Sequence, residues 1–122
     1  MLRIAECRLR IDSQYQGATG FAHGGIIATL LDEAMAKANG MSGVRAVTLK
    51  ISISYRKMVP VQQPLKLIGW RTIRKGRKLY LRSELRDQSD VLLAEARGLF
   101  LEITDPEFLS AKGLNQTPDS PG

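Results

Sequence analysis

The hydrophobic pattern of the sequence changes near residue 40 from a helical period to a strand period. Residues 23–39 form the only long segment in which apolar residues recur at helical spacing. From residue 47 the apolar residues alternate with polar ones, as expected of a strand with one buried face. The apolar positions of this segment are Val47, Leu49, Ile51, Ile53 and Tyr55. The chain therefore offers one helix to cover a sheet.

Four more segments are predicted to be strands. They cover residues 2–11, 65–74, 78–87 and 91–104. Gly76 supplies a turn between the second and third of these segments, and links this short imply antiparallel pairing. The predicted fold class is α+β, with one long helix on one face of a five-stranded antiparallel sheet. The other face, or an edge, is left for a partner subunit.

The bulk composition indicates one globular domain. Of 122 residues, 43% are hydrophobic and 25% charged, and residues 1–108 are expected to form the domain. Residues 109–122 are polar and rich in Pro and Gly, which predicts a disordered tail. No apolar run is long enough to span a membrane, and charged residues interrupt the N-terminal segment, which argues against a signal peptide.

The cysteine and histidine counts exclude two kinds of site. Cys7 is the only cysteine and His23 the only histidine, so an intramolecular disulfide and a Cys/His zinc site are both ruled out. A lone cysteine favours a reducing compartment, and the cytoplasm is the expected location. No metal is expected.

The net charge of +6 is concentrated in the middle of the chain. Between residues 45 and 86 there are twelve Lys or Arg and one acid, Glu84. Such a segment suits a polyanionic partner, but it also fits a sheet whose outward positions are filled with solvated cations. Because no aromatic-basic signature of nucleic-acid binding accompanies the charge, a nucleic-acid partner is not expected.

The predicted helix carries an apolar stripe that faces the sheet. The stripe consists of Ile27, Leu30, Leu31, Ala34, Met35 and Ala38. Small residues at Ala94, Ala96 and Gly98 share one face of the last strand and leave room for this helix. Asp32 lies beyond the edge of the stripe among small residues, which makes it the candidate for chemistry. Glu33 lies on the opposite flank, one turn before Lys37, as in an ordinary solvent-exposed pair.

His23, Gly24 and Gly25 stand at the start of the helix, where the first backbone N–H groups have no partner within the helix. Glycine lets a ligand approach these groups, as an oxyanion or phosphate site requires. The alternatives are that the glycine pair only permits a tight turn and that His23 only caps the helix.

The spacing of these candidates restricts how they can cooperate. Gly24 and Asp32 are eight residues apart, about 12 Å along a helix. One chain therefore cannot present both groups to the same small reacting group. If both serve one reaction, they come from different chains, and an antiparallel pairing of two copies of the helix would create two equivalent sites.

With these features in place, the sequence resembles the hotdog-fold thioesterase superfamily, in its phenylacetate-degradation and acyl-CoA thioesterase branch. The resemblance extends over about residues 4–103. Its motifs are HGGIIATLLDEA, VTLKISISYRKMVP, GRKLYLRSELRDQ and LLAEARGLF. The specific part is the combination of HGG, an acid eight residues after the first Gly, and a strand that ends in Tyr-basic-basic-x-x-Pro.

The resemblance implies a fold, a reaction and site residues. It implies a helix wrapped by a five-stranded antiparallel sheet, paired as a homodimer or a tetramer. It implies hydrolysis of an acyl-CoA thioester, with the carbonyl held by the backbone N–H of Gly24 and with Asp32 of the partner chain as general base or nucleophile. Thr48 is implied to assist the water. Coenzyme A is then part of the substrate, and no separate cofactor is expected.

Further residues are expected to contact the substrate. His23 and Gly25 flank the implied oxyanion donor, and Gln16 is the candidate to replace an Asn that some family members place six residues before the His, where this chain has Gly17. The coenzyme A phosphates could be bound by either of two basic clusters. One is Arg56 and Lys57, and the other is the turn with Arg74, Lys75, Arg77 and Lys78.

Two other functions remain as alternatives. A hotdog domain can bind acyl-CoA without catalysis, although no output domain accompanies this one. Hotdog dehydratases and hydratases pair a catalytic His with an acid in motifs that this sequence lacks.

Overall fold

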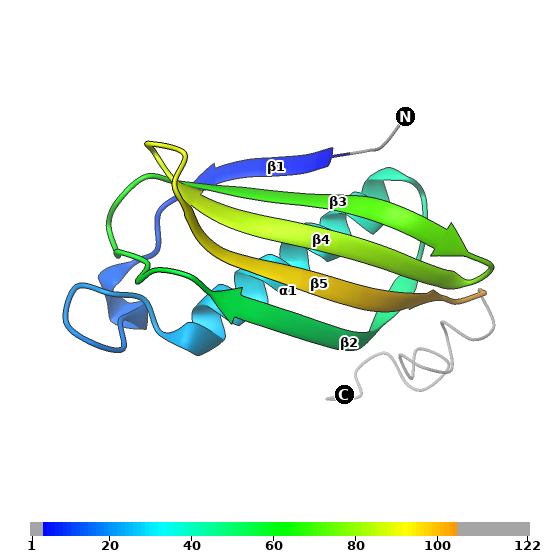
Figure 1. The fold of residues 1–122 in the computed structure, drawn as a ribbon, viewed down its shortest axis with the longest axis horizontal. Helices are drawn as coiled ribbons and strands as arrows, with labels where there is room; N and C mark the ends of the chain where they lie inside the picture. The colour runs from blue at the N-terminus through cyan, green and yellow to red at the C-terminus, as the bar shows by residue number, and fades with distance from the viewer. Residues whose placement is uncertain (1–3, 105–122) are drawn as a thin grey trace, which may run out of the picture.

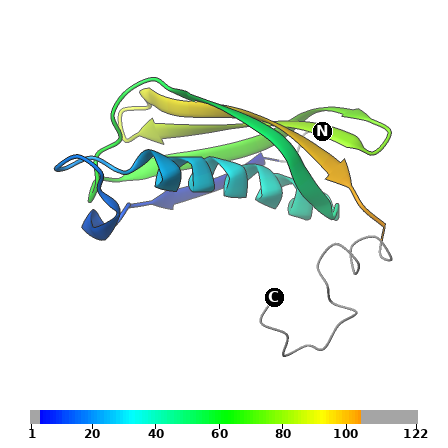
Figure 2. The same cartoon turned by 90° about the horizontal axis from the view of Figure 1, so that it is seen from below.

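In the computed structural model, which describes residues 4–104, one helix packs across a five-stranded antiparallel sheet (Figures 1 and 2). The elements are β1 (Ile4–Leu9), η1 (Ser13–Tyr15), α1 (Gly24–Met41), β2 (Ala46–Tyr55), β3 (Leu65–Lys75), β4 (Lys78–Asp87) and β5 (Leu92–Glu102). The strand order is β1-β3-β4-β5-β2, so β1 and β2 are the two edges. The predicted α+β class and hotdog arrangement are confirmed. The tail predicted at residues 109–122 lies outside the described residues.

Close contact between α1 and the sheet depends on small residues in the strands. A Cβ atom on Gly69 of β3 would lie 2.3 Å from the carbonyl oxygen of Ala34, and one on Gly98 of β5 would lie 2.8 Å from the sulfur of Met35. Ala94 and Ala96 are buried on the same face of β5 as Gly98. The predicted role of these small residues is confirmed, because the helix fills the space they leave. The predicted stripe is buried as well, with Leu30 only partly so.

A β-bulge in β2 breaks the predicted alternation. Thr48 pairs with Phe100 and Lys50 with Leu99, so Leu49 is an extra residue without its own partner, and it is 52% exposed. A bulge reverses which face the side chains before it occupy. The strict alternation predicted from the sequence is therefore wrong before Lys50. Thr48, predicted to point outward, turns toward α1.

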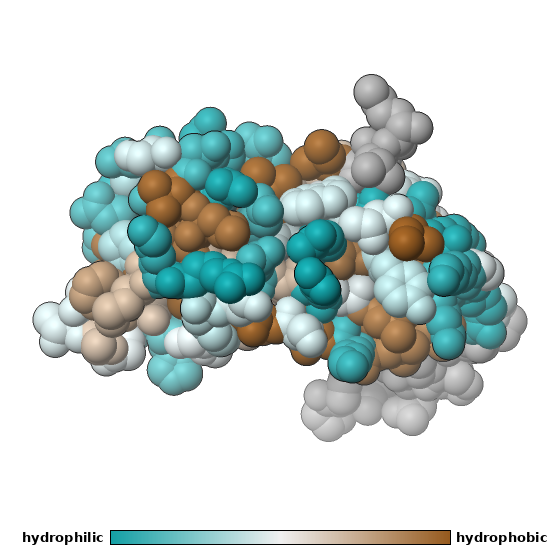
Figure 3. Space-filling view, in the orientation of Figure 1, coloured by the Kyte–Doolittle hydropathy of each residue, from teal (hydrophilic) through white to brown (hydrophobic). Residues whose placement is uncertain are grey.

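The outer face of the sheet is mixed in character, with hydrophilic and hydrophobic residues interspersed (Figure 3). Glu95 on this face pairs with Arg56 and, more loosely, with Arg82, while Arg86 pairs with Glu84. Part of the positive charge between residues 45 and 86 is thus used in surface ion pairs, each of which adds little stability.

Two kinds of feature are absent from the described residues. No helix among residues 4–104 is long and apolar enough to cross a membrane. Within the same range, no group of three or more His, Cys, Asp or Glu side chains is arranged to hold a metal ion.

Candidate active site

The start of α1 is organised by its histidine. His23 is the N-cap residue, with φ −66° and ψ 139°, and its Nδ1 accepts a hydrogen bond of 2.9 Å from the N–H of Gly25. The histidine therefore acts as a cap, and the first-turn donor at Gly25 is already occupied. The N–H of Gly24 has no partner within residues 4–104. Of the two glycine donors considered from the sequence, Gly24 is the one available to a ligand.

Tyr55 contacts the start of α1. The sequence analysis did not identify it as a site residue. Its hydroxyl donates a 3.0 Å hydrogen bond to the carbonyl oxygen of Gly24, which ties the end of β2 to the start of α1. The pattern placed Tyr55 only on the buried face of its strand, yet it is 53% exposed. No sequence signal marked the contact, since it joins positions that are 31 residues apart.

A groove of about 360 Å³ opens beside Gly24. It is bordered by Tyr55 and by the two basic residues that follow it, Arg56 and Lys57. Arg56 also pairs with Glu95 at 2.8 Å, while just over half of its side chain stays exposed. One of the two predicted basic clusters therefore lies beside the free Gly24 N–H in the same chain.

The second basic cluster lies at the other end of the sheet. Tyr55, at the end of β2, pairs with Ala94 near the start of β5, whereas Lys78 pairs with Leu101 near the end of β5. Arg77 donates its Nε–H to the carbonyl oxygen of Glu102 at 2.9 Å. Within one chain, Arg77 and Lys78 are thus separated from Gly24 by the length of a strand.

Asp32 and Thr48 meet between α1 and β2. The Thr48 hydroxyl donates a 3.1 Å hydrogen bond to Oδ1 of Asp32, and Asp32 is half-buried. The bulge at Leu49 makes this contact possible, because it turns Thr48 toward the helix. The structure thus brings together, in one chain, a carboxylate and a hydroxyl that orients it. Both Gly24 and Asp32 belong to α1, so their separation of about 12 Å along the helix holds.

Gln16 lies in the loop before α1, with its side-chain oxygen already engaged. Its Oε1 accepts a 2.9 Å hydrogen bond from the N–H of Gly20. The loop is also held by the N–H of Gly17, which donates to the carbonyl oxygen of Phe21. The side-chain N–H groups of Gln16 have no partner within residues 4–104 and are the atoms it could offer to a ligand.

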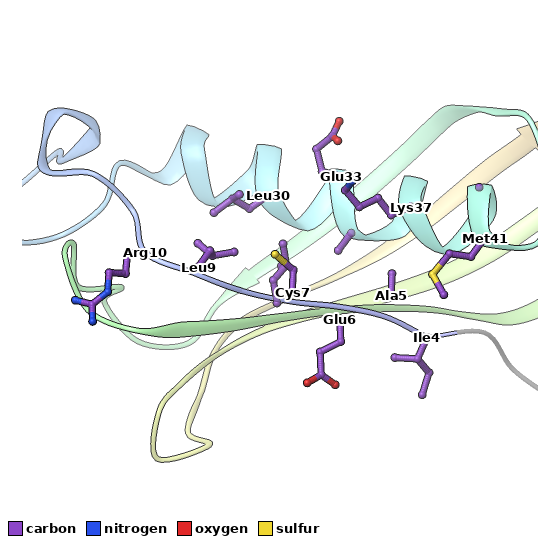
Figure 4. A pocket seen from close by; sticks show the side chains of 13 residues that line it. Ile4, Ala5, Glu6, Cys7, Leu9, Arg10, Leu30, Glu33, Lys37 and Met41 are labelled. Carbon is purple, nitrogen blue, oxygen red and sulfur yellow. The ribbon is translucent and has the colours of Figure 1, made fainter.

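The opposite flank of α1 carries a larger groove, of about 950 Å³, between the helix and β1 (Figure 4). Cys7 of β1 and Lys37 of α1 line it together with Glu33, whose side chain points away from β1. Glu33 and Lys37 form no ion pair within the described range, so the pair predicted from their spacing is absent. Cys7, which lines this groove, is exposed.

Comparisons with known proteins agree with one another. Residues 19–94 match the thioesterase superfamily. The human acyl-coenzyme A thioesterase THEM5 is 30% identical over 99 residues, which are 80% of this chain and 40% of that protein, so the chain spans about two fifths of its length.

Solved structures share the fold. The smu.793 protein of Streptococcus mutans, solved bound to acetyl CoA, is 24% identical with a TM-score of 0.78, covering 83% of this chain and 82% of that one. The PaaI protein of the E. coli phenylacetic acid degradation operon is 21% identical with a TM-score of 0.78, covering 83% and 73%.

Proposed function

The chain belongs to the thioesterase superfamily, and on that premise we propose that it hydrolyses an acyl-CoA thioester to a free acid and coenzyme A. The observation that carries the proposal is that α1 holds both the Asp32 carboxylate, which accepts a hydrogen bond from Thr48 of β2, and the Gly24 N–H, which has no partner within residues 4–104. An activated water and an oxyanion donor are the two requirements of thioester hydrolysis. In this proposal coenzyme A is part of the substrate, and no separate cofactor takes part.

The proposed site combines two protomers. Since about 12 Å separates Gly24 from Asp32 along α1, the donor of one chain acts with the carboxylate of the other. The edge strand β2 lies on the Asp32 side of α1 and leaves one row of backbone groups unpaired within the described residues. A two-fold pairing along this side produces two identical sites in a homodimer. A tetramer would be a pair of such dimers.

The reaction proceeds in two steps. Asp32 takes a proton from a water molecule while the water oxygen attacks the thioester carbon, and Thr48 keeps the carboxylate oriented. The negative charge that develops on the carbonyl oxygen is stabilised by the Gly24 N–H of the other chain, at about 3 kcal/mol for one oriented donor. The tetrahedral intermediate then collapses, the C–S bond breaks, and the proton passes from Asp32 to the leaving thiolate of coenzyme A.

Residues near Gly24 are proposed to hold the rest of the substrate. Arg56 and Lys57 border the groove beside Gly24 and are the proposed partners of the coenzyme A phosphates. His23 acts by capping α1. The side-chain N–H groups of Gln16 are proposed to donate a hydrogen bond to the attacking water. The lone Cys7 fits a reducing compartment, and the cytoplasm is the proposed location.

The first test is thiol release from short, medium, long and aromatic acyl-CoAs. We expect hydrolysis of at least one class. Calorimetric binding of acyl-CoA without thiol release would instead identify a non-catalytic acyl-CoA-binding module.

The second test separates the backbone donor from the side chain. Gly24→Pro removes the N–H and adds a ring that this position can accept, since proline is favoured at the first position of a helix and His23 already has the extended conformation that a following proline requires. We expect kcat to fall about a hundredfold or more. Gly24→Ala keeps the N–H, and its Cβ would lie an ordinary 3.5 Å from the Tyr55 hydroxyl, so it should retain most activity.

Mixed dimers test the sharing of the site. Dimers that contain one Gly24→Pro chain and one Asp32→Asn chain, isolated on two different tags, should have one intact site and one doubly defective site. We expect them to recover about half of the wild-type activity, although each parent dimer is nearly inactive. Inactive mixed dimers would place both groups in one chain and contradict the proposal.

A further inference from the structure

Two buried side chains in the described part of the chain have polar atoms without a partner. Both amide atoms of Asn39, on α1, lack a hydrogen bond, and so does the hydroxyl of Ser83, on β4. The two residues are 3% and 1% exposed. Burial of an unpaired polar group costs free energy, so each of these residues requires an explanation.

Asn39 lies on the same face of α1 as Asp32. The two are seven residues apart, which is close to two helical turns and about 10 Å along the axis. Asn39 and Thr48 both line a groove of about 380 Å³ between the second half of α1 and the start of β2. Because Thr48 donates to Asp32, this groove begins beside the proposed catalytic carboxylate.

The groove is lined by both small apolar and polar residues, and Asn39 is the buried polar residue among them. Its lining residues are Ala36, Asn39, Val44, Arg45, Ala46, Val47 and Thr48. Of these, Asn39 is the residue whose buried polar atoms lack partners. Arg45 is exposed. A volume near 380 Å³ is at the lower end of the range for small-molecule sites.

We propose that this groove receives the acyl group and that the Asn39 amide forms a hydrogen bond with a polar group at its far end. The inference rests on the proposed function, because the thioester carbon must lie beside Asp32 for the acyl group to extend along the groove. The substrate class is then an acyl-CoA with a hydroxyl or carbonyl group distal to the thioester. A primary amide can donate to and accept from such a group.

A buried amide without a partner can distinguish acyl groups that carry a distal polar group from those that do not. The amide atoms are covered by neighbouring atoms, so in this proposal a rotation about the Cβ–Cγ bond, which is soft in asparagine, brings one of them to the groove when the substrate binds. A distal hydroxyl on the substrate would then supply the partner that Asn39 lacks. An acyl group without one leaves the amide unpaired, which is how a buried polar group rejects an apolar analogue.

The test compares matched substrates in matched variants. Straight-chain acyl-CoAs from butanoyl to decanoyl are compared with their ω-hydroxy counterparts by kcat/KM. We expect the wild type to prefer the hydroxylated member at one or more chain lengths. Asn39→Leu, which is similar in volume and has no polar atom, should lower that preference by about threefold to tenfold.

Ser83→Ala is the matched control. It removes the other unpaired buried group, and Ser83 is not among the residues that line the groove. It should leave the preference unchanged. Both variants should unfold at the same or a higher temperature than the wild type, because each removes an unsatisfied polar group. If a folded Asn39→Leu protein keeps the wild-type preference at every chain length, or if the wild type shows none, the proposal is overturned.

A binding experiment separates this inference from the proposed function. In the Asp32→Asn protein, calorimetry measures the affinity for each pair of acyl-CoAs with and without Asn39→Leu. An Asn39-dependent preference in binding supports the inference even if no acyl-CoA is hydrolysed. Hydrolysis without any such preference, in binding or in turnover, supports the proposed function and overturns the inference.

Discussion

The two flanks of α1 differ in what they offer to a substrate. The flank facing β1 has the larger groove, about 950 Å³, and there Glu33 and Lys37 have no ion pair within residues 4–104. The flank facing β2 has smaller grooves, but on it a hydroxyl holds the Asp32 carboxylate in place. A reaction depends on groups held in a defined geometry, so the proposed site lies on the β2 flank despite its smaller grooves.

Neutralising one acid on each flank tests the difference between the two flanks. Asp32→Asn is expected to lower kcat by at least about a hundredfold, because the amide cannot take a proton from water. Glu33→Gln, the adjacent residue on the other flank, should change kcat little. Thiol release and circular dichroism of both purified variants check activity and folding.

The pair is its own control, because both substitutions replace a carboxylate by an amide at adjacent positions of one helix. Equal losses from the two variants would mean that helix stability and not chemistry is affected. Full activity of Asp32→Asn would show that the carboxylate takes no part in catalysis and would favour a site on the β1 flank.

A smaller effect is expected from the residue that holds Asp32. Thr48→Val removes the 3.1 Å hydrogen bond and keeps the branched shape, so kcat should fall by about tenfold with little change in KM. Thr48→Ser keeps the hydroxyl and should stay near wild type. An equal fall in both variants would show that the methyl group and not the hydrogen bond matters.

The location of Thr48 also shows where prediction from the sequence succeeds and where it fails. Regular periodicity identified the helix, all five strands and the stripe that buries Leu31 and Met35, because each depends on a repeated local pattern. Periodicity alone assigned Thr48 to the outer face. A bulge adds one residue to a strand and leaves no clear mark in the pattern, so the orientation of Thr48 had to come from the resemblance or from the structure.

At the start of the helix, too, local features could be predicted from the sequence and contacts in space could not. The HGG motif located the free donor at Gly24, since unpaired N–H groups are a property of every helix start. The contact from Tyr55 could not be predicted, because it depends on how β2 and α1 meet in space. The exposure of Cys7 likewise depends on β1 being an edge strand with a groove beside it.

The smallest effect is expected from Cys7, the only cysteine of the chain, although it lines the larger groove. If that groove held the substrate, the thiol would be the natural nucleophile, and its removal would abolish turnover. With the chemistry on the other flank, Cys7→Ala should change kcat/KM by less than about twofold, as for other exposed substitutions.

Alkylation of the wild type by N-ethylmaleimide extends the test by placing a bulky group in the groove. Unchanged activity after complete labelling, verified by mass spectrometry, is expected, because the alkylated thiol and the Asp32 carboxylate lie on opposite sides of α1. A loss on labelling that the Cys7→Ala variant does not show would mean that the two flanks communicate through the helix.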